Sequence, residues 1–438
     1  MLMMPPELQM QEFTIRGGVL SRRVTVGEHS FLAKVRVPAG SKAELQTWWK
    51  AYLSGARPIF ANLDAPVLRT VDLFCGPGGL AMGFRQAAEE CGFVAESVLA
   101  VDQDEGALGV YKRNHKTRIT SSESVSMLVN YQILGNGDGA TMFNDPVIAS
   151  RLSHLVGKVD VVLAGPPCQG HSNLNNHSRR TDQRNALYLT APAMAIALKA
   201  PIVIIENVPA VVHDHKGVVS SSISLLKEAG YYVEYGVHCA SDMGWPQTRK
   251  RYFIVASRDV NPLSIESVAN ALARDKPLSV WWAIREFERK KSRHFVDQLP
   301  VLSALNEQRV NFLIDNQIHE LPNEERPDCH KDGTTYTAVY GRMYKDKPAP
   351  TLTGGFLSPG RGRFTHPTQP RVLTPREAAR IQAFPDDYRF DAVDGVVPGR
   401  TQLAKWIGDA VPMPLGYAAA LSALMPRVNL DIELQKGK

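Results

Sequence analysis

Residues 67–90, VLRTVDLFCGPGGLAMGFRQAAEE, join a short apolar stretch to a helical one through a glycine-rich turn. The apolar stretch is rich in β-branched and aliphatic residues, which is typical of a buried strand. The glycines of the turn permit backbone conformations that other residues rarely adopt. A strand that leads through a tight turn into a helix is half of a βαβ unit, so this stretch predicts an α/β fold.

The same alternation of strand and helix continues as far as residue 259. Apolar runs that predict further strands lie at residues 97–102, 158–165, 201–208 and 251–257, with helical segments between them. Short β-branched runs separated by helices indicate a doubly wound, mostly parallel sheet. We therefore predict one α/β domain over residues 67–259.

The remainder of the chain differs in composition. Residues 260–370 begin with charged helical stretches and continue with loops rich in proline and glycine, which predicts a smaller second domain. Residues 371–428 contain two helical stretches, and the second is apolar enough to pack back against the sheet. Residues 1–66 predict an extension made of a hairpin and a helix, whose role the sequence leaves unclear.

Overall composition restricts the class of protein. Hydrophobic residues make up 44% of the chain, which excludes a disordered protein. The net charge of +6 permits a polyanionic partner without demanding one. The five cysteines are scattered without CxxC spacing, so we expect neither a disulfide framework nor a bound metal. With no evident export signal or membrane span, we expect a cytoplasmic protein.

The turn at residues 72–79, DLFCGPGG, is the first candidate ligand site. Its glycines allow a ligand to approach the backbone closely, and the following helix N-terminus offers free N–H groups. Asp102 ends the next predicted strand and can accept hydrogen bonds from ribose hydroxyls. Because Gly76, Gly78 and Ala81 also satisfy the loose dinucleotide pattern, an NAD-dependent oxidoreductase remains an alternative.

Three further motifs lie beside predicted strands of the same sheet. Residues 165–170, GPPCQG, place Cys168 after two prolines, which suits a nucleophile held in one geometry. Glu206 ends an apolar run, where a carboxyl is costly to bury unless it is paired, hydrogen-bonded or protonated. In residues 247–251, QTRKR, strand alternation puts Arg249 and Arg251 on one face.

Together these motifs resemble the C5-cytosine DNA methyltransferase family, whose signatures are DLFxGxGG, GPPCQG, ENV and QxRxR in this order. The resemblance continues through DQRNAL, RVLTPREAARIQAFPDDYRF and GDAVP, at residues 182–187, 371–390 and 408–412. It covers the chain from about residue 67 to residue 424. It implies a Rossmann-like class I methyltransferase fold with a target-recognition domain, S-adenosylmethionine as methyl donor, no metal, and double-stranded DNA as substrate.

Carried over residue by residue, the resemblance implies covalent catalysis on a cytosine flipped out of the duplex. Cys168 would add to C6 and Glu206 would hold N3. Arg251, with Arg249, would hold O2. The implied cofactor residues are Phe74, Gly76, Pro77, Gly78, Gly79, Asp102, Leu187 and Asp409. The residues expected to contact DNA are Gln169, Ser172, Arg184, Gln247 and Arg342.

The sequence departs from the family pattern at two places in the cofactor site. Asp409 replaces the usual asparagine. The carboxyl retains an oxygen acceptor, but when it is ionised it lacks the donors of the asparagine amide. The acid that usually meets the adenine has no clear counterpart, because Glu123, Asp138 and Asp145 all remain candidates. The sequence also leaves open a cognate restriction endonuclease as partner and RNA as a substrate. We expect a monomer.

The first 66 residues fall outside the resemblance. We expect the arginines of the hairpin, among them Arg22 and Arg23, to face outward and to follow a phosphate backbone. Trp48 and Trp49 on the helix are expected to pack against the catalytic domain. On this interpretation the hairpin supplements DNA recognition, and residues 1–40 can be removed without loss of the fold.

Overall fold

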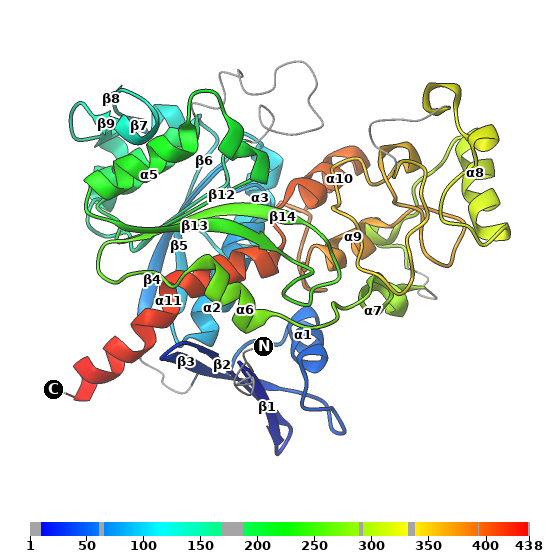
Figure 1. Cartoon of the computed structure of the whole chain (residues 1–438), viewed down its shortest axis with the longest axis horizontal. Helices are drawn as coiled ribbons and strands as arrows, with labels where there is room; N and C mark the ends of the chain where they lie inside the picture. Colours follow the sequence, from blue (N-terminus) through cyan, green and yellow to red (C-terminus); the bar gives the residue numbers. More distant parts are fainter. Residues whose placement is uncertain are drawn as a thin grey trace, which may run out of the picture.

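The computed structural model describes residues 10–60, 65–167, 187–288, 292–331, 338–392 and 394–436. A seven-stranded sheet lies at its centre, in the order β13-β14-β12-β11-β4-β5-β6 (Figure 1). Only β14 runs antiparallel to its neighbours, so the predicted doubly wound, mostly parallel sheet is confirmed. The strands are β4 (Val67–Leu73), β5 (Val94–Val101), β6 (Ile119–Ser121), β11 (Val161–Ala164), β12 (Ile202–Asn207), β13 (Tyr232–Cys239) and β14 (Lys250–Ser257).

The order of the strands positions a ligand site. The chain proceeds from β4 through β5 to β6 on one side and then returns to place β11 on the other side of β4. The loops that leave β4 and β11 therefore diverge and open a crevice at the carboxyl edge of the sheet. Open α/β sheets bind ligands at such a switch point.

Helices cover both faces of the central sheet. One face packs against α2 (Gly79–Glu90), α3 (Glu105–His115), α6 (Ile265–Leu272) and α11 (Met413–Lys436), and the other against α4 (Thr190–Leu198) and α5 (Val218–Glu228). The chain's last helix, α11, lies directly on α2. A Cβ at Gly83 would come within 2.6 Å of backbone atoms of Met413 and Tyr417, so only glycine permits this approach.

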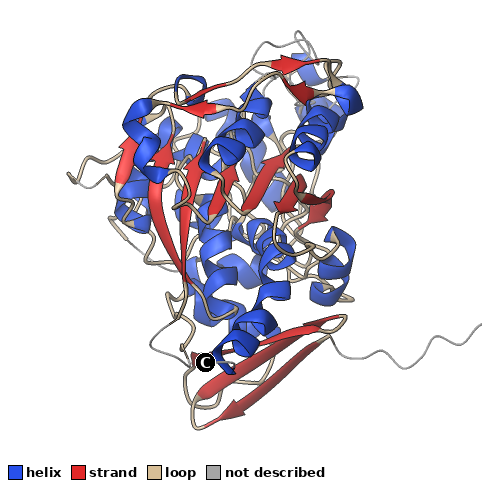
Figure 2. Ribbon diagram, turned by 90° about the vertical axis from the view of Figure 1, so that its left-hand side faces the viewer, coloured by secondary structure: helices blue, strands red, loops and turns tan. Residues whose placement is uncertain are grey.

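Residues 11–53 form a further layer beneath the helices (Figure 2). They comprise β1 (Gln11–Arg16), β2 (Val19–Val26), β3 (His29–Arg36) and α1 (Leu45–Leu53). The hairpin that we predicted is thus a three-stranded antiparallel sheet. Its inner face packs on α2, α6 and α11. Trp48 donates to Glu90 of α2 at 3.2 Å, which confirms that the helix docks by its tryptophans.

The expectation that the arginines of this segment face outward is wrong for Arg22. Strand alternation puts Arg22 on the inner face with Leu20 and Val24, and its side chain is 1% exposed. Its guanidinium pairs with Glu90 at 3.3 Å and donates to the hydroxyl of Tyr417 at 3.1 Å. Leu20, Val24 and Trp48 belong to the same buried cluster as α2 and α11, so the segment is part of the core.

The remaining elements lie between the central strands or beyond α6. A long connection between β6 and β11 forms two short antiparallel pairs, β7 (Val129–Asn130) with β10 (Val147–Ile148) and β8 (Ile133–Leu134) with β9 (Thr141–Met142). Beyond α6 the helices are α7 (Val280–Ile284), α8 (Ala304–Asp315), α9 (Pro375–Ile381) and α10 (Arg400–Asp409), and loops predominate between α8 and α9. Within the described parts of the chain, no helix is long and apolar enough to span a membrane.

We predict that Arg22→Met destabilises the fold by about 3–5 kcal/mol, because it leaves the Glu90 carboxylate buried and uncompensated. The measurement is urea unfolding followed by circular dichroism. Arg23→Met is the matched control, since the side chain of Arg23 is 45% exposed and its loss should change stability by no more than about 0.5 kcal/mol. Equal effects of the two substitutions would contradict a structural role for Arg22.

Candidate active site

A cavity of about 740 Å³ opens at the switch point of the sheet. Loops after β4, β5, β11 and β12 line it together with the end of α10. The predicted residues that the structure brings together here are Phe74, Gly76, Pro77, Gly79, Asp102, Leu187, Glu206, Arg249, Arg251 and Asp409. One cavity therefore holds the predicted cofactor loop and the predicted base-binding groups.

The glycine turn at one end of the cavity is held by Asp102. Its carboxylate accepts from the backbone N–H groups of Gly76 and Asp104, each at 2.8 Å. Burial raises the pKa of Asp102, and these hydrogen bonds oppose that rise. A Cβ added at Gly76 would meet nothing within 4 Å, so a ligand can approach the backbone there.

The neighbouring glycines serve packing. Gly78, which we predicted to contact the cofactor, is not among the lining residues of the cavity. A Cβ there would overlap the ring of His115 and lie 3.0 Å from the Tyr388 hydroxyl. Gly78 caps α2 in the left-handed conformation at φ 95°, which explains the glycine on backbone grounds. A Cβ at Gly79 would overlap the carbonyl of Val411, so the start of α2 and the GDAVP segment form one wall.

Glu206 and Arg251 form an ion pair at the other end of the cavity. Arg251 Nε lies 2.6 Å from Glu206 Oε1, and the two side chains are 12% and 9% exposed. Burial raises the pKa of Glu206, while Arg251 and Arg249 oppose the rise without cancelling it. Asn207 donates to the carbonyl of Pro166 at 3.2 Å, which ties the end of β12 to the GPPCQG loop.

Arg249 lines the cavity beside Arg251, as strand alternation predicts, but its surroundings differ. Its guanidinium is buried and donates to the carbonyls of Leu352 and Gly408, the latter at 2.9 Å. A longer contact of 3.4 Å reaches the carbonyl of Asp409. Arg249 thus holds the loop before α9 and the end of α10 against the sheet.

Comparison with known proteins decides the family. Residues 68–423 match the family model described as C-5 cytosine-specific DNA methylase. The chain belongs to this family. Type II methyltransferase M1.BsuMI of Bacillus subtilis is 36% identical over 94% of this chain and 95% of its own length. Type II methyltransferase M.AgeI of Thalassovita gelatinovora is 35% identical over 81% of this chain and 98% of its own length.

Solved structures agree on the fold. A putative DNA modification methyltransferase encoded within an E. coli prophage superposes with a TM-score of 0.52 at 22% identity, over 82% of this chain and 99% of that one. S. pombe Dnmt2 gives a TM-score of 0.52 at 16% identity, over 83% and 99%. The family match and the methyltransferase relatives, rather than these folds, make the chain a DNA (cytosine-5-)-methyltransferase with S-adenosylmethionine as methyl donor, and the oxidoreductase alternative is set aside.

The structure contradicts one predicted DNA contact of this methyltransferase, Gln247, and leaves Arg342 as a prediction. Gln247 is fully buried and donates to Gln382 at 3.0 Å and to the carbonyl of Ile381 at 3.3 Å, so it fastens the start of β14 to α9. Arg342 is half-buried and directs two nitrogens at the carbonyl of Pro367, at 2.9 and 2.7 Å, which closes a loop. The other predicted contacts, Gln169, Ser172 and Arg184, lie outside the described residues, as does Cys168.

Several cavity residues of the methyltransferase were not singled out from the sequence. Glu123 lines the cavity, whereas Asp138 and Asp145 are not among its described lining residues. Glu123 lies two residues after β6, a strand of three residues that the sequence did not reveal, so its position distinguishes it from the other two acids only in the structure. Lys405 and Trp406 also line the cavity, and Lys405 pairs with Asp409 at 2.9 Å. Lys405 and Asp409 are four residues apart on α10, a spacing at which oppositely charged side chains can pair, so the sequence contained a signal for this contact.

We predict that Gly79→Ala weakens binding of S-adenosylmethionine by about tenfold or more, because overpacking against backbone costs about 1–3 kcal/mol. The added methyl must displace the Val411 carbonyl, which moves one wall of the cavity. Isothermal titration calorimetry measures the affinity. Gly139→Ala is the matched control, since a Cβ there meets nothing within 4 Å. Wild-type affinity in Gly79→Ala would show that this contact does not shape the cofactor site.

Proposed function

We propose that the methyltransferase modifies cytosine within a specific double-stranded DNA sequence through a covalent adduct at Cys168. The observation that carries the proposal is the Glu206–Arg251 pair in the same cavity as the glycine turn. Pro167, which immediately precedes Cys168, also lines this cavity. A nucleophile, a buried acid and a cofactor loop would then face one another.

The end of the cavity next to the glycine turn fits S-adenosylmethionine. The open backbone at Gly76 and the N-terminus of α2 suit the carboxylate of the methionine part. Asp102 keeps unused lone pairs beyond its two backbone hydrogen bonds and suits the ribose, and Glu123 suits the adenine amine. We propose that Phe74, Pro77, Leu187 and Asp409 complete the site. When bound, S-adenosylmethionine supplies an electrophilic methyl group.

The residues of the chain would activate the base. The Cys168 sulfur forms a bond to C6, and the negative charge that develops in the ring is balanced by a proton that Glu206 shares with N3. Burial of Glu206 favours the protonated form that this hydrogen bond requires. Arg251 orients the carboxyl and would donate to O2, while the carbonyl of Pro166, held by Asn207, would accept from the exocyclic amine. Once C5 carries the transferred methyl group, loss of the C5 proton re-forms the C5–C6 double bond, the Cys168 sulfur leaves as a thiolate, and N3 returns the shared proton to Glu206.

DNA binding is proposed for two parts of the chain. One is the GPPCQG loop with Gln169, Ser172 and Arg184. The other is the region between α7 and α9, which we propose as the target-recognition domain.

Because the relatives carry Type II names, we also propose a cognate restriction endonuclease as partner. We further propose that the enzyme acts as a monomer in the cytoplasm. Bisulfite sequencing of DNA from a methylation-free host that expresses the chain identifies the target sequence.

The covalent step is tested by trapping. DNA that contains 5-fluorocytosine has no C5 proton to lose, so we expect the wild-type enzyme to form a stable adduct in which peptide mapping finds Cys168. Cys168→Ser should form no adduct while it still binds S-adenosylmethionine and DNA. Cys75→Ser is the matched control, because Cys75 is buried beside the cavity and should not be needed for trapping. An adduct mapped to any other cysteine would overturn the assignment.

Glu206→Gln is expected to slow single-turnover methyl transfer by about 10²–10³, because the proton that balances ring charge is lost. DNA affinity should change little, since this interaction strengthens only during attack. Burial raises the pKa of Glu206, so the wild-type rate should fall as pH rises through that pKa, and the variant should lack this dependence. Glu234→Gln on β13 is the isosteric control. Parallel losses of rate and DNA affinity would indicate a purely structural ion pair.

A further inference from the structure

Two segments connect the proposed recognition domain to the α/β body, by which we mean the central sheet and the helices that cover it. The chain leaves the body through α7 and the short helical turn Arg285–Phe287, and it returns through α9. Figure 1 shows α1 between these segments and the helices α2, α6 and α11 of the body. The segment that carries α1 precedes the residues matched by the family model, 68–423, so α1 is an addition to the family's common fold.

The first half of α1 is anchored to the body. Trp48 is 2% exposed and donates to Glu90 of α2 at 3.2 Å. The ring of Trp49 meets the rings of Tyr417 on α11 and Trp245 edge to face, with centroids 5.8 and 5.6 Å apart. Aromatic contacts of this kind fix relative orientation as well as bury area.

The outgoing connection is bonded to the same helix. Lys50 Nζ lies 2.7 Å from the carboxylate of Glu286 and 4.9 Å from the centre of the Trp282 ring. The side chain of Lys50 is 23% exposed, so its stem is mostly covered and its charge is directed at one partner. Trp282 in turn meets Trp245 of the body edge to face.

The returning connection is bonded to α1 as well. The Tyr52 hydroxyl donates to the carbonyl of Ala383 at 3.1 Å, and the Asp386 N–H donates to the carbonyl of Leu53 at 2.8 Å. Arg380 on α9 joins both connections, because it pairs with Glu286 at 3.1 Å and donates to Asp386 at 3.0 Å. The guanidinium of Arg380 is buried, whereas the carboxylates of Glu286 and Asp386 are partly exposed.

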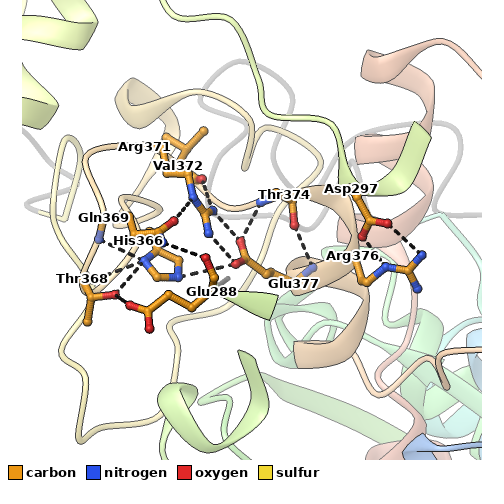
Figure 3. Close-up of polar contacts among 10 residues, drawn as sticks. All are labelled: Glu288, Asp297, His366, Thr368, Gln369, Arg371, Val372, Thr374, Arg376 and Glu377. Carbon is orange, nitrogen blue, oxygen red and sulfur yellow. Dashed lines mark hydrogen bonds and ion pairs between the residues drawn. The ribbon is translucent and has the colours of Figure 1, made fainter. Parts of the chain in front are cut away.

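The two connections are also bonded directly to each other beyond α1 (Figure 3). Glu288 accepts from the Thr368 hydroxyl at 2.6 Å, and its backbone carbonyl accepts from the Gln369 amide at 3.0 Å. Arg371 binds both oxygens of Glu377 at 2.7 Å at the start of α9. The base of the recognition domain is therefore a stiff unit, and a contact at Glu286 or Asp386 acts on the whole unit.

We propose that α1 is a brace that fixes the recognition domain relative to the cofactor cavity, and that Lys50 is a positioning residue for target DNA. The proposal rests on the proposed role of the domain between α7 and α9 in DNA binding. A flipped base must meet Cys168, Glu206 and the methyl donor in one geometry, and small misplacements of a substrate lower rates steeply. If the body and the recognition domain are held in one relative position, the enzyme binds DNA without a prior domain rearrangement. Such a rearrangement would lower the apparent affinity for DNA.

Direct phosphate binding by the N-terminal sheet is the competing explanation for any loss of DNA affinity in this segment. Its outer face carries Arg23, Lys34 and Arg36, which are exposed. Figure 1 shows this sheet beneath α2 and α11, away from α8 of the recognition domain. Lys34→Met therefore serves as the matched control, because it removes an exposed charge of the same segment without touching the brace.

The experiment compares Lys50→Met, Lys50→Arg, Glu286→Gln and Lys34→Met in the full chain. Because Glu286 is half-exposed, we expect Lys50→Met to raise KM for the target duplex about two- to fivefold and to increase methylation of sites with one mismatch. kcat and the affinity for S-adenosylmethionine should stay unchanged, and Lys50→Arg should restore KM. The double variant Lys50→Met/Glu286→Gln should show less than the sum of the two single effects, because both substitutions remove the Lys50–Glu286 pair, while only Glu286→Gln also weakens the pair with Arg380.

Hydrogen exchange of amides in residues 280–287 gives a readout independent of activity, and it should be faster in Lys50→Met. Unchanged KM and unchanged exchange in a folded Lys50→Met would overturn the brace. A rise of KM in Lys34→Met with a flatter salt dependence would replace it with direct phosphate binding. If Lys50→Met fails to fold, Glu286→Gln carries the same test. If the recognition domain of the wild-type enzyme binds no DNA, while residues 280–287 still exchange faster in Lys50→Met, the proposed DNA-binding role of the domain is refuted. The mechanical contact between α1 and the two connections would still stand.

Discussion

The contact of α2 with α11 is the constraint on which the other features of the structure depend. The two helices approach so closely that Gly83 has no space for a side chain. The approach brings the GDAVP segment, at the junction of α10 and α11, against the start of α2, where it closes the cofactor cavity. It also creates the surface on which β2 and β3 pack. One close backbone contact therefore determines both the cavity wall and the docking of the N-terminal segment.

The cavity separates charge along the sheet. Asp102 lies on the β4 and β5 side, where we propose that the cationic methyl donor binds; burial raises the pKa of its carboxyl, and two backbone hydrogen bonds oppose that rise. Arg249 and Arg251 lie on the β12 and β14 side, where the proposed mechanism places a base that gains negative charge during attack. Fixed charges that face the charges of the reaction stabilise the transition state without reorganising water. The strand order alone places these groups on opposite sides of the switch point.

The sequence was sufficient to predict the sheet and the cavity because both depend on local patterns. Parallel strands end at one edge, so Phe74 after β4 and Glu206 at the end of β12 meet there, and Arg251 joins them because the antiparallel strand β14 begins at the same edge. Burial by distant segments was not predictable. Gln247 and Arg342 are polar residues in motifs or basic stretches, and nothing local shows that α9 or residue 367 covers them. Arg22 was misplaced because its burial requires a third strand and a partner on α2.

The cofactor site also contained features hidden from sequence patterns. Glu123 could not be separated from Asp138 and Asp145, since the long connection between β6 and β11 obscures which acid follows the strand directly. Gly78 was assigned to the cofactor because the family resemblance carries it over together with the rest of the glycine turn. Its neighbours, His115 and Tyr388, come from distant parts of the chain. In both cases the missing information is a contact between segments far apart in sequence.

The buried bond between Arg22 and Tyr417 has a consequence for how the chain folds during synthesis. Its partners are separated by 395 positions, so β2 cannot complete this contact until α11 has been synthesised. Contacts of such large separation form late and slow the completion of a core. Until α11 leaves the ribosome, α2 lacks its partner and the cavity lacks the GDAVP wall. A nascent chain that has not yet reached α11 therefore lacks one wall of the proposed cofactor cavity, and the proposed reaction must wait for that wall.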